Sequence, residues 1–263
     1  MSSPRKVPQV KHFLRKLIVE ATVDTPLEYG LRAVYRGLSR SQNCKYDREL
    51  IEVLRRSLRK TSNCVDVGCY RGDILRQMVK FAPQGEHIAF EPVPENFQYL
   101  TRIFPSVRVL NMALSDKAGE ATFNVVVGRT ARSGLRKVEY PDPEQEIREV
   151  RVHVDRLDSI IPSARHIDFI KVDVEGAELR VLRGSRELIG RDRPMVVFEH
   201  GYERARYFGD RPEEVFDLLA GELGLAVSLM ERWLHGAAPM VRDEFCSHVY
   251  QNQDFCFVAY PAS

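Results

Sequence analysis

The chain has 263 residues, of which 44% are hydrophobic and 29% are charged, and its formal net charge is +2. This composition is typical of a globular protein with a sizeable core, and the interspersed charges exclude the concentrated basic face that binds nucleic acid. The five cysteines are scattered without a C-x-x-C pair, and no run of about 18 apolar residues is present, so we expect a cytoplasmic protein with reduced thiols and no transmembrane segment.

Residues 1–60 predict a helical extension that precedes the main domain. Apolar residues recur at helical spacing between Val10 and Ile18, and Thr25-Pro26-Leu27-Glu28 is typical of a helix start. A third helix is expected from about Asp47 to Lys60. The extension could cap the main domain or form the contact of a homo-oligomer, and its basic first helix could touch an anionic membrane surface.

Residues 61–263 alternate short apolar strands with helices, which indicates an α/β domain with a doubly wound, mostly parallel sheet of seven strands. The expected strands are Cys64–Val67, Ile88–Glu91, Val107–Leu110, Phe169–Asp173, Val196–Glu199, Ala226–Met230 and Phe255–Tyr260. The expected helices are Asp73–Phe81, Glu95–Phe104, Glu178–Ile189 and Arg211–Leu223, the last with a capping box from Asp210 to Glu213.

An insertion at about 119–154 interrupts this alternation. Phe123–Val127 and Val150–Val154 are expected to pair as a β-hairpin around the polar loop Gly128–Arg148. A charged insertion at this place is a candidate lid or substrate-recognition element.

A glycine-bearing turn follows the first expected strand, in the run Val65-Asp66-Val67-Gly68-Cys69-Tyr70-Arg71-Gly72-Asp73. Gly68 would let the backbone approach a ligand, and Gly72 would allow tight entry into the helix. Only two glycines are present, so the G-x-G-x-x-G dinucleotide pattern is missing. Asp66 would repel a pyrophosphate but could accept hydrogen bonds from a cationic aminoacyl group, which favours S-adenosylmethionine over NAD. The expected cofactor contacts of this turn are Asp66, Gly68, Cys69, Tyr70 and Gly72.

Two further strand ends carry the chemistry that the same cofactor needs. Glu91, followed by Pro92, places a carboxylate where it could hold both hydroxyls of a ribose. After the next strand, Ala113, Leu114 and Ser115 offer small and apolar side chains where an adenine ring would lie. Glu91 could alternatively serve only as a helix-entry residue, and the 111–116 stretch could be a simple turn.

The fourth and fifth strands end in candidate catalytic residues. Lys171 and Asp173 share one face of their strand. Asp173 stands at the carboxyl end of the strand, where it is also an expected cofactor contact. A cation on a buried strand needs a partner, for which Glu175 and Glu199 are the candidates. His200 follows Glu199 and is the only histidine at an expected core-strand end.

The sequence resembles the FkbM-type methyltransferase family, a branch of the class I methyltransferase fold. The resemblance rests on DVGCYRGD, AFEPVPENFQYL, NMALSD, RLDSI, VVFEH and above all DFIKVDVEGAELRVLRG, and it covers residues 64 to about 200. Cys69-Tyr70-Arg71 departs from the family, which usually has alanine and asparagine near this turn. This departure leaves the aminoacyl contacts open.

The resemblance implies methyl transfer from S-adenosylmethionine, most often to a hydroxyl oxygen of a sugar, polyketide or other secondary metabolite. An aliphatic hydroxyl is a poor nucleophile, so a general base is expected, with Asp173 or His200 as candidates beside Lys171. A divalent metal such as Mg²⁺ could instead acidify the hydroxyl, held by Asp173, Glu199 and His200.

Two other functions remain open at this point, and a third, nucleic-acid methylation, is excluded. A nucleotide-binding oxidoreductase would need the missing third glycine, and a non-catalytic binding module could keep the same fold. Nucleic-acid methylation would need a basic groove or an N/D-P-P-Y/F motif, and neither occurs in the sequence.

Overall fold

The computed structural model describes residues 41–128, 130–139 and 144–262, together with Gly30, Val34, Leu38 and Ser39. The chain forms two compact units, Met1–Arg48 and Glu49–Ser263. Helix α3 (Gln42–Ser57) begins in the first unit and ends in the second. Of the two helices expected before residue 40, the described residues include only Gly30, Val34 and Leu38, which are helical. The membrane and oligomer contacts suggested for these helices stay predictions.

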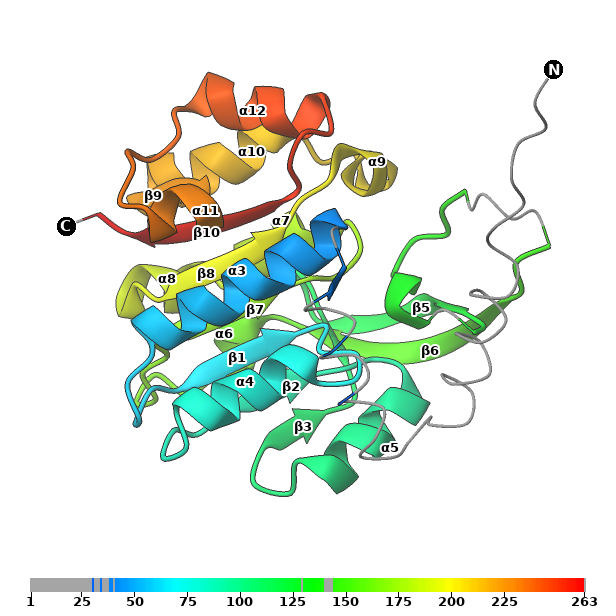
Figure 1. Ribbon diagram of the computed structural model, residues 1–263. Coiled ribbons are helices and arrows are strands. Elements are labelled where there is room, and N and C mark those ends of the chain that lie inside the picture. The colour runs from blue at the N-terminus through cyan, green and yellow to red at the C-terminus, as the bar shows by residue number, and fades with distance from the viewer. Residues whose placement is uncertain are drawn as a thin grey trace, which may run out of the picture. The chain divides into compact units, whose positions relative to one another are not determined.

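The second unit is built on a seven-stranded sheet in the order β3-β2-β1-β7-β8-β10-β9, as Figure 1 shows. All neighbours pair in parallel except β10, which is antiparallel to both β8 and β9. This confirms the expected α/β fold with a mostly parallel sheet. The strands are β1 (Cys64–Val67), β2 (Ile88–Phe90), β3 (Arg108–Leu110), β7 (Phe169–Val172), β8 (Met195–Glu199), β9 (Leu225–Leu229) and β10 (Cys256–Pro261).

The central strands β1 and β7 are buried along their whole length because helices cover both faces of a sheet of this kind, and each carries one charged residue, Asp66 and Lys171. The strand order reverses between them, since β2 and β3 follow on one side and β8 on the other. In open α/β sheets such a switch point leaves a crevice at the carboxyl ends of the strands, where ligands bind.

Helices follow most strands, and several match their expected bounds closely. The helices and helical turns are α4 (Asp73–Phe81), α5 (Pro94–Ile103), α6 (Leu157–Ile160), α7 (Glu178–Arg183), α8 (Arg186–Asp192), α9 (Tyr202–Ala205), η2 (Arg206–Phe208), α10 (Pro212–Phe216), η3 (Asp217–Glu222), α11 (Met230–Leu234) and α12 (Arg242–Tyr250). In Figure 1, α4 crosses in front of β1, and α10 and α12 lie together beyond β10.

Two expected helices are broken in the structure. The helix expected over Glu178–Ile189 divides into α7 and α8 at Gly184, where a Cβ atom would lie 2.0 Å from the carbonyl oxygen of Ser115. The helix expected over Arg211–Leu223 changes from α10 to the π-helical η3. Its capping prediction is wrong, because Glu214 accepts the hydrogen bond from the Arg211 backbone N–H at 3.1 Å.

The insertion forms the expected hairpin, with longer strands than predicted. β5 (Gly119–Val126) and β6 (Ile147–Asp155) are antiparallel, and β6 also pairs in parallel with the short β4 (Ala113–Leu114). The short helix η1 (Thr130–Arg132) lies between the two hairpin strands. Inward side chains of the two hairpin strands form a small core together with β4 and the residue before α5; this core comprises Val93, Ala113, Phe123, Val125, Val152 and Val154.

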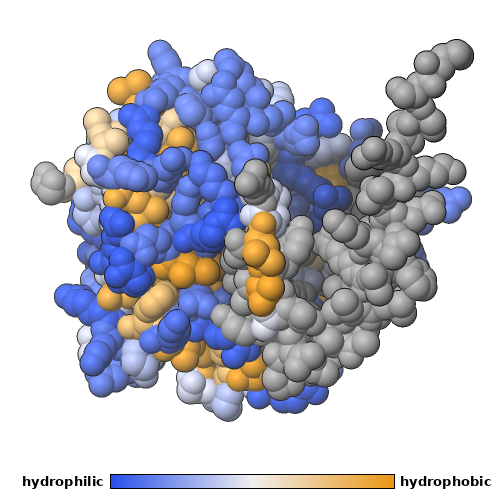
Figure 2. Space-filling model, in the orientation of Figure 1, coloured by the Kyte–Doolittle hydropathy of each residue, from blue (hydrophilic) through white to orange (hydrophobic). Residues whose placement is uncertain are grey.

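The face of the molecule in Figure 2 is largely hydrophilic, with apolar side chains scattered between charged ones. Large exposed apolar side chains in the described part of the second unit are few, namely Val127, Tyr202, Val241 and Tyr250. Among the described residues, no helix combines the length and the apolar composition that crossing a membrane requires.

Candidate functional site

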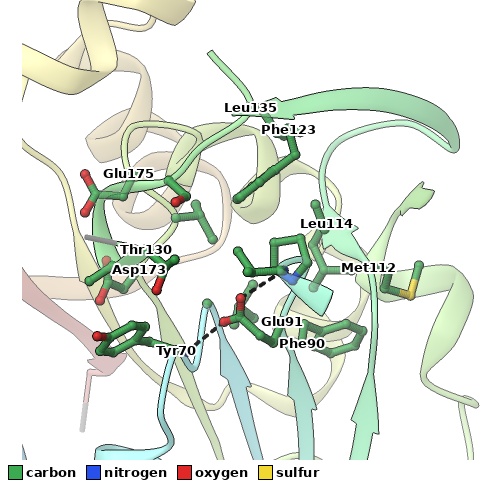
Figure 3. Close-up of a pocket in the computed structure, with 18 residues that line it drawn as sticks. Tyr70, Phe90, Glu91, Met112, Leu114, Phe123, Thr130, Leu135, Asp173 and Glu175 are labelled. Carbon is green, nitrogen blue, oxygen red and sulfur yellow. Dashed lines mark hydrogen bonds between the residues drawn. The ribbon is translucent and has the colours of Figure 1, made fainter. Parts of the chain in front are cut away.

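A pocket opens at the switch point, between the carboxyl ends of the central strands and the inserted hairpin (Figure 3). Residues from β1, β2, β4, the loop after β7 and the insertion line it. Of the predicted cofactor residues, the lining includes Gly68, Tyr70, Glu91, Pro92, Ala113, Leu114 and Asp173. The structure therefore brings together most of the side chains that the sequence singled out at separate strand ends.

The turn after β1 passes very close to the chain that follows β7. Gly68 has a φ of +74°, and a Cβ atom there would lie 1.9 Å from the carbonyl oxygen of Asp173. The backbone N–H of Gly68 donates to the carbonyl oxygen of Phe90 at 3.0 Å. Only glycine combines this left-handed conformation with so close an approach. The two strand ends are thereby locked against one another at one wall of the pocket.

Glu91 lies at the middle of the pocket and is only 4% exposed. One carboxylate oxygen accepts a hydrogen bond from the Tyr70 N–H at 2.8 Å, and the other accepts from the Val93 N–H at 3.0 Å and the Asn96 amide at 3.3 Å. Burial raises the pKa of Glu91 to about 7, although these donors act in the opposite direction. A carboxylate oxygen has two lone pairs, so the oxygen that Tyr70 occupies can accept one further donor from the pocket.

The two ends of the pocket differ in polarity (Figure 3). On one side of Glu91 the walls are apolar and include Phe90, Met112, Leu114, Phe123 and Leu135. On the other side Tyr70, Thr130, Asp173 and Glu175 bring hydroxyl and carboxylate groups together. An elongated ligand with an aromatic end, a central diol and a charged end would match this order of surfaces.

The loop after β7 is held by a buried carboxyl group. Glu178 accepts hydrogen bonds from the backbone N–H groups of Val174 and Gly176 at 3.1 and 3.0 Å. Burial raises the pKa of Glu178 to about 8. Between these two anchors Glu175 adopts a left-handed φ of 56°, which is costly for a residue with a side chain. The loop thus presents Glu175 to the pocket in a fixed conformation.

Glu175 and Asp173 place two carboxylates at the polar end. The Glu175 carboxylate lies 3.3 Å from the Arg204 guanidinium, which α9 supplies. Burial, together with the neighbouring Asp173, raises the pKa of Glu175 to about 7. Asp173 pairs with the Lys171 ammonium at 3.3 Å. This end of the pocket can therefore hold a cation or accept a proton.

The partners of Lys171 differ from those predicted. Its ammonium contacts the carboxylates of Asp66 at 3.4 Å and Asp173 at 3.3 Å and donates to the carbonyl oxygen of Gly68 at 3.0 Å, whereas Glu175 and Glu199 are not its ion-pair partners. Burial alone would lower the pKa of Lys171, but the two aspartates outweigh it and raise the pKa. Lys171 thereby fixes Asp173 at the rim of the pocket.

Asp66 does not reach the pocket. It is fully buried beneath the turn, next to Lys171, because side chains alternate along β1 and Asp66 faces a covering helix layer. The predicted contact between Asp66 and an aminoacyl group is therefore not supported. Gly72, Cys69 and Ser115 also lie outside the lining. Gly72 instead allows α5 to pack closely, since a Cβ atom would lie 2.6 Å from the Phe104 ring.

His200 also lies away from the pocket. It is fully buried, and its ring stacks on Phe245 of α12 with a centroid distance of 6.5 Å and an interplanar angle of 12°. Burial lowers the pKa of His200 to about 4. Glu199 ends β8 and His200 follows it, so alternation along the extended chain turns these two side chains in opposite directions. The predicted role of His200 as a base in this pocket thus lacks the geometry it needs.

The predicted metal ligands Asp173, Glu199 and His200 do not form a ligand set. Within the described ranges, no three His, Cys, Asp or Glu side chains are grouped so that they could hold a metal ion. The position of the His200 ring against Phe245 accounts for this, because it removes the only nitrogen ligand from the edge of the sheet.

The insertion supplies the lining residues that sequence reasoning missed, namely Phe123, Thr130, Ala131, Ser133 and Leu135. Bridge hydrogen bonds between Asn124 and Gly134 fold the segment after η1 back onto β5 and over the pocket. The only sequence signal for these residues was the position of the insertion itself, which indicated a lid without specifying its inner face.

Comparison with known proteins places this site in a family. Residues 66–228 match the family described as the methyltransferase FkbM domain. The chain is 25% identical over 214 residues to 2-O-methyltransferase NoeI of Sinorhizobium fredii, an alignment that covers 73% of this chain and 84% of that protein. It is 30% identical over 149 residues to methyltransferase 1 of Beauveria bassiana, which covers 46% of this chain and 57% of that protein.

Among solved structures, methyltransferase FkbM from Methylobacillus flagellatus aligns with 77% of this chain and 44% of its own length, at 19% identity and a TM-score of 0.48. The family match spans more than half of the sequence and contains all three strand ends that form the pocket, together with the Lys171–Glu178 block. The chain belongs to the FkbM family of S-adenosylmethionine-dependent methyltransferases.

Proposed function

We propose that the pocket binds S-adenosylmethionine and that the protein transfers its methyl group to a hydroxyl oxygen of a small molecule such as a sugar or another secondary metabolite. The observation that carries this proposal is the position of Glu91, a buried carboxylate with one lone pair left between an apolar and a polar end of one pocket. The ribose would bind Glu91 and the adenine would lie between Phe90, Met112 and Leu135.

The residues at the polar end fit the remaining part of this cofactor. The Gly68 turn lets the backbone approach the ligand, and Tyr70, which follows it, lines the same wall. Asp173 and Glu175 offer carboxylates to a cationic amino group or sulfonium. When bound, S-adenosylmethionine supplies a methyl carbon on a positively charged sulfur, which a hydroxyl oxygen can attack in line.

A hydroxyl acceptor loses its proton as its oxygen bonds to the methyl carbon, so the protein needs a base within hydrogen-bond reach of that oxygen. Of the two predicted candidates, Asp173 lines the pocket and His200 does not. In this proposal Asp173 accepts the proton of the hydroxyl group, and Lys171 orients Asp173 through an ion pair of 3.3 Å. Alignment of the hydroxyl with the methyl group supplies much of the acceleration, and the hairpin that closes the pocket would provide it.

The oxygen specificity has separate support. The relative from Sinorhizobium fredii is named a 2-O-methyltransferase, and the alignment with it covers 84% of that protein. Transfer of labelled methyl from S-adenosylmethionine to a panel of sugars and polyketide alcohols tests this part. A product with the methyl group on nitrogen or carbon would contradict it.

Binding of the cofactor is tested by calorimetric titration with S-adenosylmethionine and, separately, with NAD. We expect binding of the first and none of the second; absence of binding by S-adenosylmethionine would overturn the proposal.

The Glu91→Gln substitution tests the ribose assignment. Loss of the one charge-assisted hydrogen bond that the remaining lone pair can accept, worth roughly 1.5–3 kcal/mol, should weaken S-adenosylmethionine binding about 10- to 100-fold. Glu187→Gln is the matched control, because Glu187 lies on α8 with a side chain that is 78% exposed. An unchanged dissociation constant in a folded Glu91→Gln protein would remove Glu91 from the site.

A further inference from the structure

A second cavity of about 340 Å³ lies beside the cofactor pocket, between the 115–122 segment, the insertion, α7 and η2. Its volume is in the range of small-molecule sites. Leu135 lines both cavities and forms part of the wall between them. The proposed methyl transfer gives this cavity no role.

Three cations from separate elements converge on the cavity. Lys117 comes from the loop between β4 and β5, Arg136 from the insertion and Arg180 from α7. The phenyl ring of Phe208 makes cation–π contacts with two of them: the guanidinium carbons of Arg136 and Arg180 lie 5.9 and 5.6 Å from its centroid. Like charges that line one cavity repel one another, and an anion between them would remove that repulsion.

Little in the described chain neutralises Lys117 and Arg136. Neither forms an ion pair with a described residue, although 37 acidic residues are present in the sequence. Glu120, the only carboxylate in the lining, is already paired with Arg151 at 2.7 Å. The cavity therefore presents two uncompensated cations from facing elements.

Arg180 is held in place but keeps a donor unused. It donates to the carbonyl oxygen of Phe208 at 3.0 Å, and the carboxylates of Asp210 and Asp116 lie 3.6 and 3.9 Å away. Its Nε atom is buried and has no hydrogen-bond partner. That atom is closed to solvent, so a ligand in the cavity would meet the accessible part of the Arg180 side chain, which is 26% exposed.

We propose that this cavity binds the anionic group, a phosphate, sulfate or carboxylate, of a small organic molecule. Guanidinium groups suit the planar, bidentate recognition of such oxyanions, and the ammonium of Lys117 adds a third charge. Val154, Ala121 and Leu135 give the same cavity an apolar wall, which suits the organic part of the ligand. The site is separate from the cofactor pocket, so it does not depend on the proposed function.

The test is calorimetric titration of the full chain with inorganic phosphate and with phenyl phosphate at low ionic strength. We expect saturable binding of both, with phenyl phosphate the tighter because it also contacts the apolar wall. Lys117→Glu and Arg136→Glu should each weaken phosphate binding at least 10-fold, since both side chains are exposed and their replacement leaves the core intact.

Lys80→Glu is the matched control, because this substitution changes the net charge by the same amount. Lys80 is exposed on α4 and lies outside the cavity lining. This variant should bind phosphate as the unchanged protein does. The proposal would be overturned if phosphate binding were not saturable, or if all variants bound phosphate with equal affinity. An equal loss of phosphate affinity in Lys80→Glu would also overturn it. Thermal melting of every variant confirms that the comparison is made between folded proteins.

Discussion

Gly68 stands at the point where two strand ends meet, and its missing side chain determines how closely they approach. A Cβ atom would overlap the backbone carbonyl of Asp173, which cannot move away as the end of a flexible side chain could. The same residue begins the turn that carries Tyr70 into the pocket. A single methyl group at this position would therefore disturb both the fold and the site.

The Gly68→Ala substitution should lower the free energy of unfolding by about 3 kcal/mol or more and abolish S-adenosylmethionine binding. Gly209→Ala is the matched control, because Gly209 has the same φ of +74° and nothing within 4 Å of a Cβ atom. It should cost only the backbone strain, about 1–2 kcal/mol. Urea unfolding measures the free energy of unfolding of both variants. Equal losses of stability in Gly68→Ala and Gly209→Ala would show that the close approach to Asp173 is unimportant.

At the scale of single residues, the sequence could predict which strand ends matter but not which side chains turn into the pocket. Gly68, Glu91 and Asp173 were each expected at the carboxyl end of a parallel strand, and in the structure they line one pocket because those ends share one edge of the sheet. Asp66 and His200 occupy equally suggestive positions and point elsewhere. The direction of these two side chains depends on which helix covers each face of the sheet. The packing of those helices depends on residues throughout the chain.

At the scale of elements, the inserted hairpin converts an open strand edge into a closed pocket. Its strands were predicted as a pair around a polar loop, yet the segment after η1 that lines the pocket has no periodic pattern of its own. The bridge between Asn124 and Gly134 sets its position. The break between α7 and α8 was hidden for a similar reason, since it arises from the approach of Gly184 to Ser115.

The hairpin's contribution to cofactor binding can be measured with Leu135→Ala. Removal of this partly buried side chain should raise the dissociation constant for S-adenosylmethionine about 5- to 30-fold, which corresponds to about 1–2 kcal/mol of lost apolar contact. Val127→Ala is the control on the same hairpin, since Val127 is 39% exposed and lies outside the lining. Equal affinities in the two variants would show that the insertion is not part of the binding site.

At the scale of the whole molecule, the site concentrates carboxylates that the fold has removed from water. Burial raises the pKa of Glu91 and Glu175 to about 7 and that of Glu178 to about 8. In the unfolded chain these groups titrate near pH 4.5. Between the two values the folded state binds protons that the unfolded state has lost, so the stability falls as the pH rises.

The contribution of Glu178 to this slope can be isolated, because one of its oxygens accepts both loop hydrogen bonds and the other has no partner. In Glu178→Gln the amide oxygen can replace the accepting oxygen, and no proton is exchanged. Between about pH 5 and 8, the free energy of unfolding of the unchanged protein should therefore fall more steeply than that of Glu178→Gln, by up to about 1.4 kcal/mol per pH unit.

Chemical unfolding across this range measures the difference, and the exposed Glu187→Gln is expected to keep the slope of the unchanged protein. Parallel curves for Glu178→Gln and the unchanged protein would mean that Glu178 is not protonated in the folded state, and that the loop after β7 is held by an ionised carboxylate.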